Sequence, residues 1–270
     1  MTRNPERLIE AVIFDLDDTL IDWSQPALTW DEHTRPMVDS VYDYLQQEGH
    51  KLPSRDHFFK VMRECTQRVW NDALEAWTGA SLDRALGLAL TACDIAVEDV
   101  DMEQMMRAYT WRPMPGVECY DDAIDVLQAL REQGYKIGLI TNSFLPMWMR
   151  DVELRHYDLL DYFDARLTSG DSGYLKPHPA IYEHMLEMLE VDAESAVFVG
   201  DRPSHDIAGA NEVGLVSVLI DPPHLERELD GTVPDFTITT LSELLPVLER
   251  LEAPPGVDGQ GPAPVKTSSE

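Results

Sequence analysis

Three carboxylates follow an apolar segment near the start of the chain. Residues 11–14 read Ala-Val-Ile-Phe, and the sequence continues as Asp15-Leu16-Asp17-Asp18-Thr19. A short apolar run with β-branched members is typical of a strand buried on both faces, and this strand would carry the acids at its carboxyl end. Ligands of open α/β sheets bind beyond that end of the strands. Asp15 and Asp17 are therefore candidate site residues, although acids after a strand also cap helices that follow.

Later segments repeat this design of an apolar run that ends in polar side chains. Residues 136–140 and 196–199 are two such runs, and a Lys-Pro pair lies between them, ahead of a helical pattern. If the strands are parallel neighbours, their polar ends meet at one edge of the sheet. The polar residues delivered to that edge are Thr141, Asn142, Lys176, Asp201 and Asp206.

This set of side chains suits phosphoryl transfer. A phosphate ester is anionic, so a carboxylate attacks it only when a cation neutralises the shared charge. Carboxylates at several strand ends form an oxygen-rich pocket suited to Mg²⁺. Asp15 would be the nucleophile, while Asp17 would protonate the leaving oxygen and later take a proton from water. Thr141 and Asn142 would hold phosphate oxygens, and Lys176 would stabilise the transferring group.

The ordered motifs Asp-x-Asp-x-Thr, strand-Thr-Asn, Lys-Pro and Gly-Asp resemble the haloacid dehalogenase-like (HAD) hydrolase superfamily, over about residues 9–222. The resemblance implies an α/β fold with a Rossmann-like parallel sheet and an inserted α-helical cap. It also implies an aspartyl-phosphate intermediate and a Mg²⁺ ion held by Asp15, the backbone carbonyl of Asp17, and Asp201. Asp206 would be a further ligand or a partner of Lys176.

Asp17 also bears on the type of reaction. Cleavage of a carbon–halogen bond releases a halide that needs no proton, and dehalogenases of this superfamily lack an acid at this position. The acid therefore favours a Mg²⁺-dependent phosphatase acting on a small phosphomonoester. Two alternatives stay open: a phosphomutase of the same superfamily and a non-catalytic phospho-ligand-binding protein. His205 stands where the family often has Asn, and we expect it to be a surface residue at a helix start.

The spacing of the motifs predicts the domain organisation. About 120 residues separate Leu20 from Thr141, but only about 35 separate Thr141 from Lys176, so an extra module must lie in the longer gap. Apolar residues at helical spacing fill that gap, for example at positions 38, 41 and 45. The predicted parts are a core of residues 1–20 and 113–252, a helical cap of 21–112, and a disordered tail of 253–270.

Two further strands, at 216–220 and 236–238, and a helix at 242–251 are expected to complete the core. Five of the six tryptophans lie in the predicted cap and its borders. We expect most of them to pack in the interior or between cap and core. A sharper expectation is that Trp23, close to the acids, lines the pocket for the leaving group.

Composition limits the partners and the compartment. The net charge of −29 argues against nucleic acid and anionic membranes as partners. The sequence has no apolar run of about 18 residues and no apolar segment before the first strand, which predicts a soluble, cytoplasmic protein. The three cysteines lack metal-ligand spacing and are expected to be reduced thiols. The expected partner is a small phosphorylated substrate, and the sequence leaves the oligomeric state open.

Overall fold

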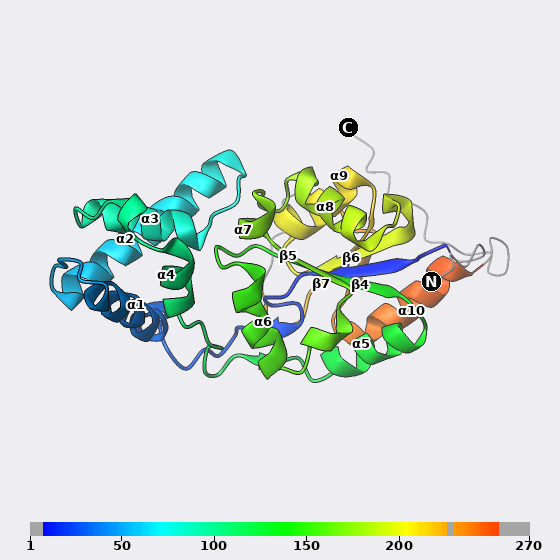
Figure 1. The fold of residues 1–270 in the computed structure, drawn as a ribbon. Helices are drawn as coiled ribbons and strands as arrows, with labels where there is room; N and C mark the ends of the chain where they lie inside the picture. The colour runs from blue at the N-terminus through cyan, green and yellow to red at the C-terminus, as the bar shows by residue number, and fades with distance from the viewer. Residues whose placement is uncertain (1–7, 226–228, 230, 254–270) are drawn as a thin grey trace, which may run out of the picture.

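A computed structural model describes residues 8–225, 229 and 231–253. These residues form a six-stranded sheet with helices on both faces, and a group of helices lies to one side of it (Figure 1). All neighbouring strands are parallel, in the order β5-β4-β1-β6-β7-β8. The predicted α/β fold class is therefore confirmed. The strands are β1 (Ala11–Phe14), β4 (Lys136–Thr141), β5 (Ala165–Thr168), β6 (Ala196–Gly200), β7 (Val216–Ile220) and β8 (Phe236–Ile238).

The central strand β1 is buried on both faces, as its apolar run predicts. Val12 and Phe14 belong to the apolar core beside α5 (Ala123–Glu132) and α10 (Leu244–Glu252). Ala11 and Ile13 belong to the core on the opposite face, beside α8 (Pro179–Leu189) and α9 (Ala208–Val213). Because successive side chains of a strand point to opposite faces, one short strand helps to build both cores.

Most predicted elements of the sheet are present, and one strand was missed. The expected runs correspond to β1, β4, β6, β7 and β8, whereas none of them corresponds to β5. That strand lies at the edge of the sheet, and only its first and last residues are buried. It therefore lacks the continuous apolar pattern of the central strands. The predicted last helix forms as a 3₁₀ turn (Leu241–Glu243) followed by α10, and the predicted tail lies, except for Ala253, outside the described residues.

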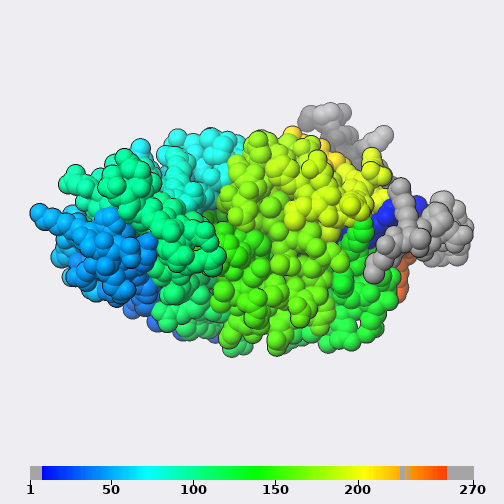
Figure 2. Space-filling model, viewed as in Figure 1, coloured from blue at the N-terminus to red at the C-terminus, as the bar shows by residue number. Residues whose placement is uncertain are grey.

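Four helices form the cap, which lies at the left of Figure 1 in blue to green. They are α1 (Trp30–Gln47), α2 (Arg55–Ala76), α3 (Leu82–Ala92) and α4 (Met102–Ala108). The apolar residues at helical spacing in α1 and α2 meet in a core of their own, which includes Val41, Phe58 and Met62. Leu145, in the loop before α6 (Met147–His156), and Met149, in the first turn of that helix, join that core. The cap thus packs directly on the sheet domain, and their surfaces meet in Figure 2.

The two connections between cap and core lie against each other. β2 (Ile21–Asp22) pairs antiparallel with β3 (Glu118–Cys119), which joins the outgoing and returning chain. Gly116 has a φ of +84°, and a Cβ atom there would lie 2.5 Å from the carbonyl oxygen of Gln25. Glycine is therefore required where the two connections cross. The predicted boundaries at residues 21 and 112 lie near this crossing and stay predictions.

The remaining expectations about the chain concern membranes and thiols. None of the helices in the described ranges is both long and apolar enough to cross a bilayer. Cys65, Cys93 and Cys119 are free and partly buried, as expected for reduced thiols.

Candidate active site

The carboxyl ends of β1, β4 and β6 bring the predicted site residues together. β1 lies between β4 and β6, and the backbone N–H of Asp15 donates to the carbonyl of Val199 at 2.9 Å, which extends the β1–β6 pairing. After Asp17 the chain turns at Asp18, whose φ is +59°, and enters β2. No helix follows the acids in this part of the described chain, so the capping interpretation is wrong. The acids lie instead at the point where the strand order reverses, which is the usual ligand site of such sheets.

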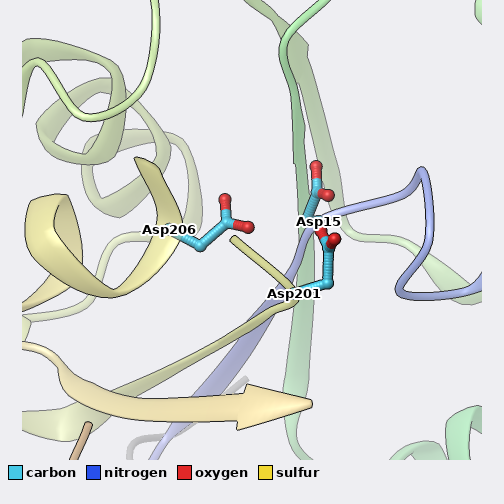
Figure 3. A group of neighbouring side chains, drawn as sticks. All are labelled: Asp15, Asp201 and Asp206. Carbon is cyan, nitrogen blue, oxygen red and sulfur yellow. The ribbon is translucent and has the colours of Figure 1, made fainter. Parts of the chain in front are cut away.

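Three buried carboxylates face one another at this edge (Figure 3). Asp15 follows β1, Asp201 follows β6, and Asp206 lies in a π-helical turn, Pro203–Ile207. A carboxylate oxygen from each lies within 4.8 Å of the other two, and their exposed fractions are 6%, 0% and 1%. A Cβ atom on Gly200 would lie 2.5 Å from the Asp206 side chain, so the glycine allows this acid to approach the end of β6.

Lys176 is the cation that enters this cluster. Its Nζ lies 2.6 Å from Oδ1 of Asp15 and 2.8 Å from Oδ1 of Asp206, and it donates to the carbonyl of Ile140 at 3.0 Å. Burial would lower the pKa of Lys176, but the two carboxylates outweigh burial and the pKa is raised. One ammonium group cannot balance three buried carboxylates. The donor set therefore has the charge and the oxygen atoms to hold a divalent cation.

The excess of negative charge in this cluster also affects the pKa of Asp15. Burial raises the pKa of Asp15 to about 7, Lys176 opposes the rise, and the negative charges of Asp206 and Asp17 add to it. A cation bound among the carboxylates would favour the ionised form of Asp15.

Asn142 holds the backbone of Lys176. Its side-chain Oδ1 accepts from the Lys176 N–H at 2.9 Å, and its Nδ2 donates to the Lys176 carbonyl at 3.1 Å. This pair of hydrogen bonds gives Asn142 a positioning role toward the lysine. Its predicted contact with a phosphate oxygen stays a prediction.

Asp17 is surrounded by hydrogen-bond donors. The Arg150 guanidinium donates to both carboxylate oxygens, at 2.7 and 2.9 Å, the Trp23 indole N–H donates at 2.8 Å, and the Thr141 hydroxyl donates at 3.1 Å. Burial would raise the pKa of Asp17, but Arg150 and the other donors outweigh it and the pKa is lowered. Asp17 is therefore a carboxylate in this conformation, and the buried Thr141 contacts it directly.

Arg150 was not predicted from the sequence. It lies on α6 and is 4% exposed, and its Nη1 lies 2.7 Å from Oε2 of Glu153, which is 1% exposed. Burial raises the pKa of Glu153 to about 7, against the pull of Arg150. Charged residues three apart on a helix normally indicate a solvated pair, so no local pattern indicates that these two are buried next to Asp17.

A cavity of about 750 Å³ lies between the carboxylates and the cap. Asp15, Asp17 and Lys176 line its core side, and residues of α1 and α2 line its cap side. Trp23 is among the lining residues, and its expected role at the leaving group stays a prediction.

His205 also lines the cavity, and its ring centre lies 5.9 Å from that of Trp77. It is half-buried in the turn that carries Asp206 and belongs to the cavity wall, so the expectation of a plain surface position is corrected.

The fold and the site together define the class of protein. A parallel sheet with an inserted helical cap, and with acids and a buried lysine where the strand order reverses, is the architecture of a Rossmann-like α/β enzyme. The chain belongs to the haloacid dehalogenase-like hydrolase family, whose model matches residues 9–214. The resemblance inferred from the motifs is thus confirmed, and the protein is a hydrolase of this family.

Relatives and solved structures cover nearly the whole chain. A glyceraldehyde 3-phosphate phosphatase of Methanopyrus kandleri is 29% identical over 90% of this chain and 99% of its own. The crystal structure of a HAD phosphatase from Thermococcus onnurineus is 28% identical, with a TM-score of 0.53 over 89% of this chain and 98% of its own. A 2-haloacid dehalogenase from Pseudomonas syringae is also 28% identical, with a TM-score of 0.53 over 90% of this chain and 99% of its own. Overall likeness therefore does not separate the two reactions.

Proposed function

We propose that this protein is a Mg²⁺-dependent phosphatase that hydrolyses a small phosphomonoester through an aspartyl-phosphate intermediate. The observation that carries the proposal is the pair of acids at the end of β1. Asp15 lies in the carboxylate cluster, and Asp17 lies beside it at the cavity. A halide leaving group has no use for an acid at the second position, whereas an alkoxide leaving group needs a proton. The relative named as a glyceraldehyde 3-phosphate phosphatase supports the same reaction.

The residues present fit a magnesium ion. Asp15, Asp201 and Asp206 would hold it together with the backbone carbonyl of Asp17, since Mg²⁺ prefers carboxylate, carbonyl and water oxygens. When bound, the ion would neutralise charge between the nucleophile and the phosphate.

The first half-reaction transfers the phosphoryl group to Asp15. A carboxylate oxygen of Asp15 forms a bond to phosphorus, the bond from phosphorus to the ester oxygen breaks, and that oxygen takes a proton from Asp17 and leaves as the alcohol. Lys176, 2.6 Å from Asp15, stabilises negative charge at the transferring group. Asp17 must carry a proton at this stage, so at least one of its three donors has to withdraw when substrate binds.

The second half-reaction releases phosphate. Water attacks the phosphorus of the aspartyl phosphate, Asp17 takes a proton from that water, and the Asp15 carboxylate is restored. The contacts around Asp17 suit this step, because Arg150, Trp23 and Thr141 all favour its ionised form. The net reaction converts a phosphomonoester and water into an alcohol and inorganic phosphate.

The test is release of inorganic phosphate from a panel of phosphomonoesters with Mg²⁺ present. Asp15→Asn should abolish release, because an amide cannot form the phosphoenzyme. Asp18→Asn is the matched control, since asparagine tolerates the φ of +59° at Asp18. Phosphate release by Asp15→Asn at the wild-type rate would refute the assignment. A parallel assay for isomerised sugar phosphate distinguishes a phosphomutase, and ligand binding without turnover would indicate a binding protein.

A further inference from the structure

The cavity beside the catalytic residues is large for a three-carbon substrate. Its volume of about 750 Å³ lies in the range of about 300–1,000 Å³ in which proteins bind drug-sized ligands. The phosphate group and its immediate contacts occupy only the end at Asp15 and Lys176. The rest of the space extends toward α1 and α2, so it is available to the leaving group of the substrate.

The walls of this space are rich in aromatic rings. Trp30 comes from α1, and Phe59 and Trp70 come from α2. Trp23 on the outgoing connection and Phe144 from the loop after β4 lie on the wall as well. Val38, Met62, Leu74 and Leu145 add further apolar surface. Such a wall gains free energy by removing hydrocarbon or a ring from water.

The cap side of the cavity offers no unpaired charge among the described residues that line it. Its charged members are Asp31 and Arg63, and these pair with each other at 2.9 Å. A second phosphate or a carboxylate on the part of the leaving group that contacts α1 and α2 would therefore meet no unpaired cation there. Arg202 also lines the cavity, but it follows Asp201 on the core side, at the end where the phosphate binds. The net charge of −29 disfavours additional anionic groups further.

We infer that the substrate is a monophosphate ester of an uncharged alcohol that carries an aromatic ring, and that the ring occupies the cap side of the cavity. This inference rests on the proposed phosphatase function and specifies its substrate class. Hydrolysis gives the ring-bearing alcohol and inorganic phosphate, with water as the only co-reactant.

The first experiment compares alkyl phosphates whose leaving alcohols have similar basicity. Release of phosphate is measured for ethyl, butyl and 2-phenylethyl phosphate, with phosphoglycolate and 3-phosphoglycerate as esters that carry an extra carboxylate. Full burial of a phenyl ring corresponds to roughly a 10- to 150-fold gain in binding. We expect kcat/KM to rise by such a factor from ethyl to 2-phenylethyl phosphate and to be lowest for the two carboxylates.

The second experiment places a charge on the wall with a matched control. Leu74 on α2 lines the cavity and is 39% exposed, and Met188 on α8 is 51% exposed and lies outside the cavity lining. Leu74→Lys and Met188→Lys add the same charge at an exposed helical position, so both variants should fold. We expect Leu74→Lys to lower kcat/KM for 2-phenylethyl phosphate and to raise it for phosphoglycolate, each at least fivefold. Met188→Lys should leave the ratio of the two unchanged.

The results of these experiments test the phosphatase function and the substrate class separately. No phosphate release from any ester would refute the proposed function itself. Release that favours ethyl phosphate or the carboxylates over 2-phenylethyl phosphate would overturn the substrate class and leave the phosphatase function standing. A phenyl preference that responds equally to Leu74→Lys and Met188→Lys would show that the ring does not bind at this wall.

Discussion

The buried pair of Arg150 and Glu153 gives a prediction about stability that can be worked out from the structure. Arg150→Met keeps the length and apolar stem of the side chain but removes its charge. Glu153, 1% exposed, then lies without its cation, which is 2.7 Å away in the wild-type protein. Removal of one partner of a buried ion pair costs about 3–5 kcal/mol. Since each kcal/mol shifts Tm by roughly 2–4 °C in a protein of this size, Tm should fall by about 10 °C.

The pH dependence of this loss follows from the pKa of Glu153. Burial raises that pKa from an ordinary value of 4.5 to about 7, and Arg150 is the group that opposes the rise. Without Arg150 the pKa rises further. A carboxyl group with a raised pKa in the folded state contributes stability below pH 4.5 and loses it as the pH rises through 7. The Tm deficit of Arg150→Met relative to wild type should therefore be larger at pH 9 than at pH 5.

Thermal unfolding followed by circular dichroism at pH 5, 7 and 9 measures both effects. Adding Glu153→Gln to Arg150→Met removes the unpaired charge at Glu153 and should restore part of the lost Tm, while Asp17 still lacks the guanidinium that donates to both of its oxygens. The matched control is Arg166→Met, which breaks the more exposed pair with Asp151 at 2.8 Å and should cost only about 0–1 kcal/mol. A Tm of Arg150→Met no lower than that of Arg166→Met, or a further loss of Tm on adding Glu153→Gln, would show that Glu153 does not depend on Arg150 for its burial.

Three further predictions concern the acids, the metal and the linker. Asp17→Asn should slow hydrolysis of ethyl phosphate by about 10²- to 10⁴-fold but that of an aryl phosphate much less, since an aryl leaving group needs little protonation; equal slowing in a phosphate-release assay would contradict the acid role. Mg²⁺ should raise Tm more at pH 8 than at pH 5. The pKa of Asp15 is raised to about 7, so the metal-free protein loses stability as the pH rises through 7, whereas Mg²⁺ binds the ionised form of Asp15. A Tm shift that is independent of pH would contradict this. Gly116→Ala should lower Tm more than Gly214→Ala. Both glycines have a positive φ, but of the two only Gly116 would place a Cβ atom against backbone, at 2.5 Å. Equal losses of Tm would show that the two connections between cap and core do not pack this closely.

Much of the site could be read from the sequence because its chemistry follows local patterns. An apolar run that ends in acids predicts a buried strand with those acids at its carboxyl end, and β1 and β6 follow this rule. The parallel order of β1, β4 and β6 then brings residues far apart in sequence, such as Asp15 and Lys176, to one edge. The positions of the main acids therefore needed only the pattern of apolar runs, whereas the fold class rested on the resemblance carried by the order of the motifs.

The tertiary structure decided which groups surround those acids. Arg150 lies 133 positions from Asp17 in the sequence, and its contact depends on how α6 packs against the end of β1. Asn142 was expected at the phosphate, but its amide is bound to the backbone of Lys176. The size and apolar lining of the cavity likewise arise only when α1 and α2 fold over the sheet. The sequence by itself determined which acids lie at the carboxyl ends of the strands, since a buried strand is recognised from its own run of apolar residues. Partners, burial of charge and cavity shape required the packed chain, since these properties belong to side chains that meet only in three dimensions.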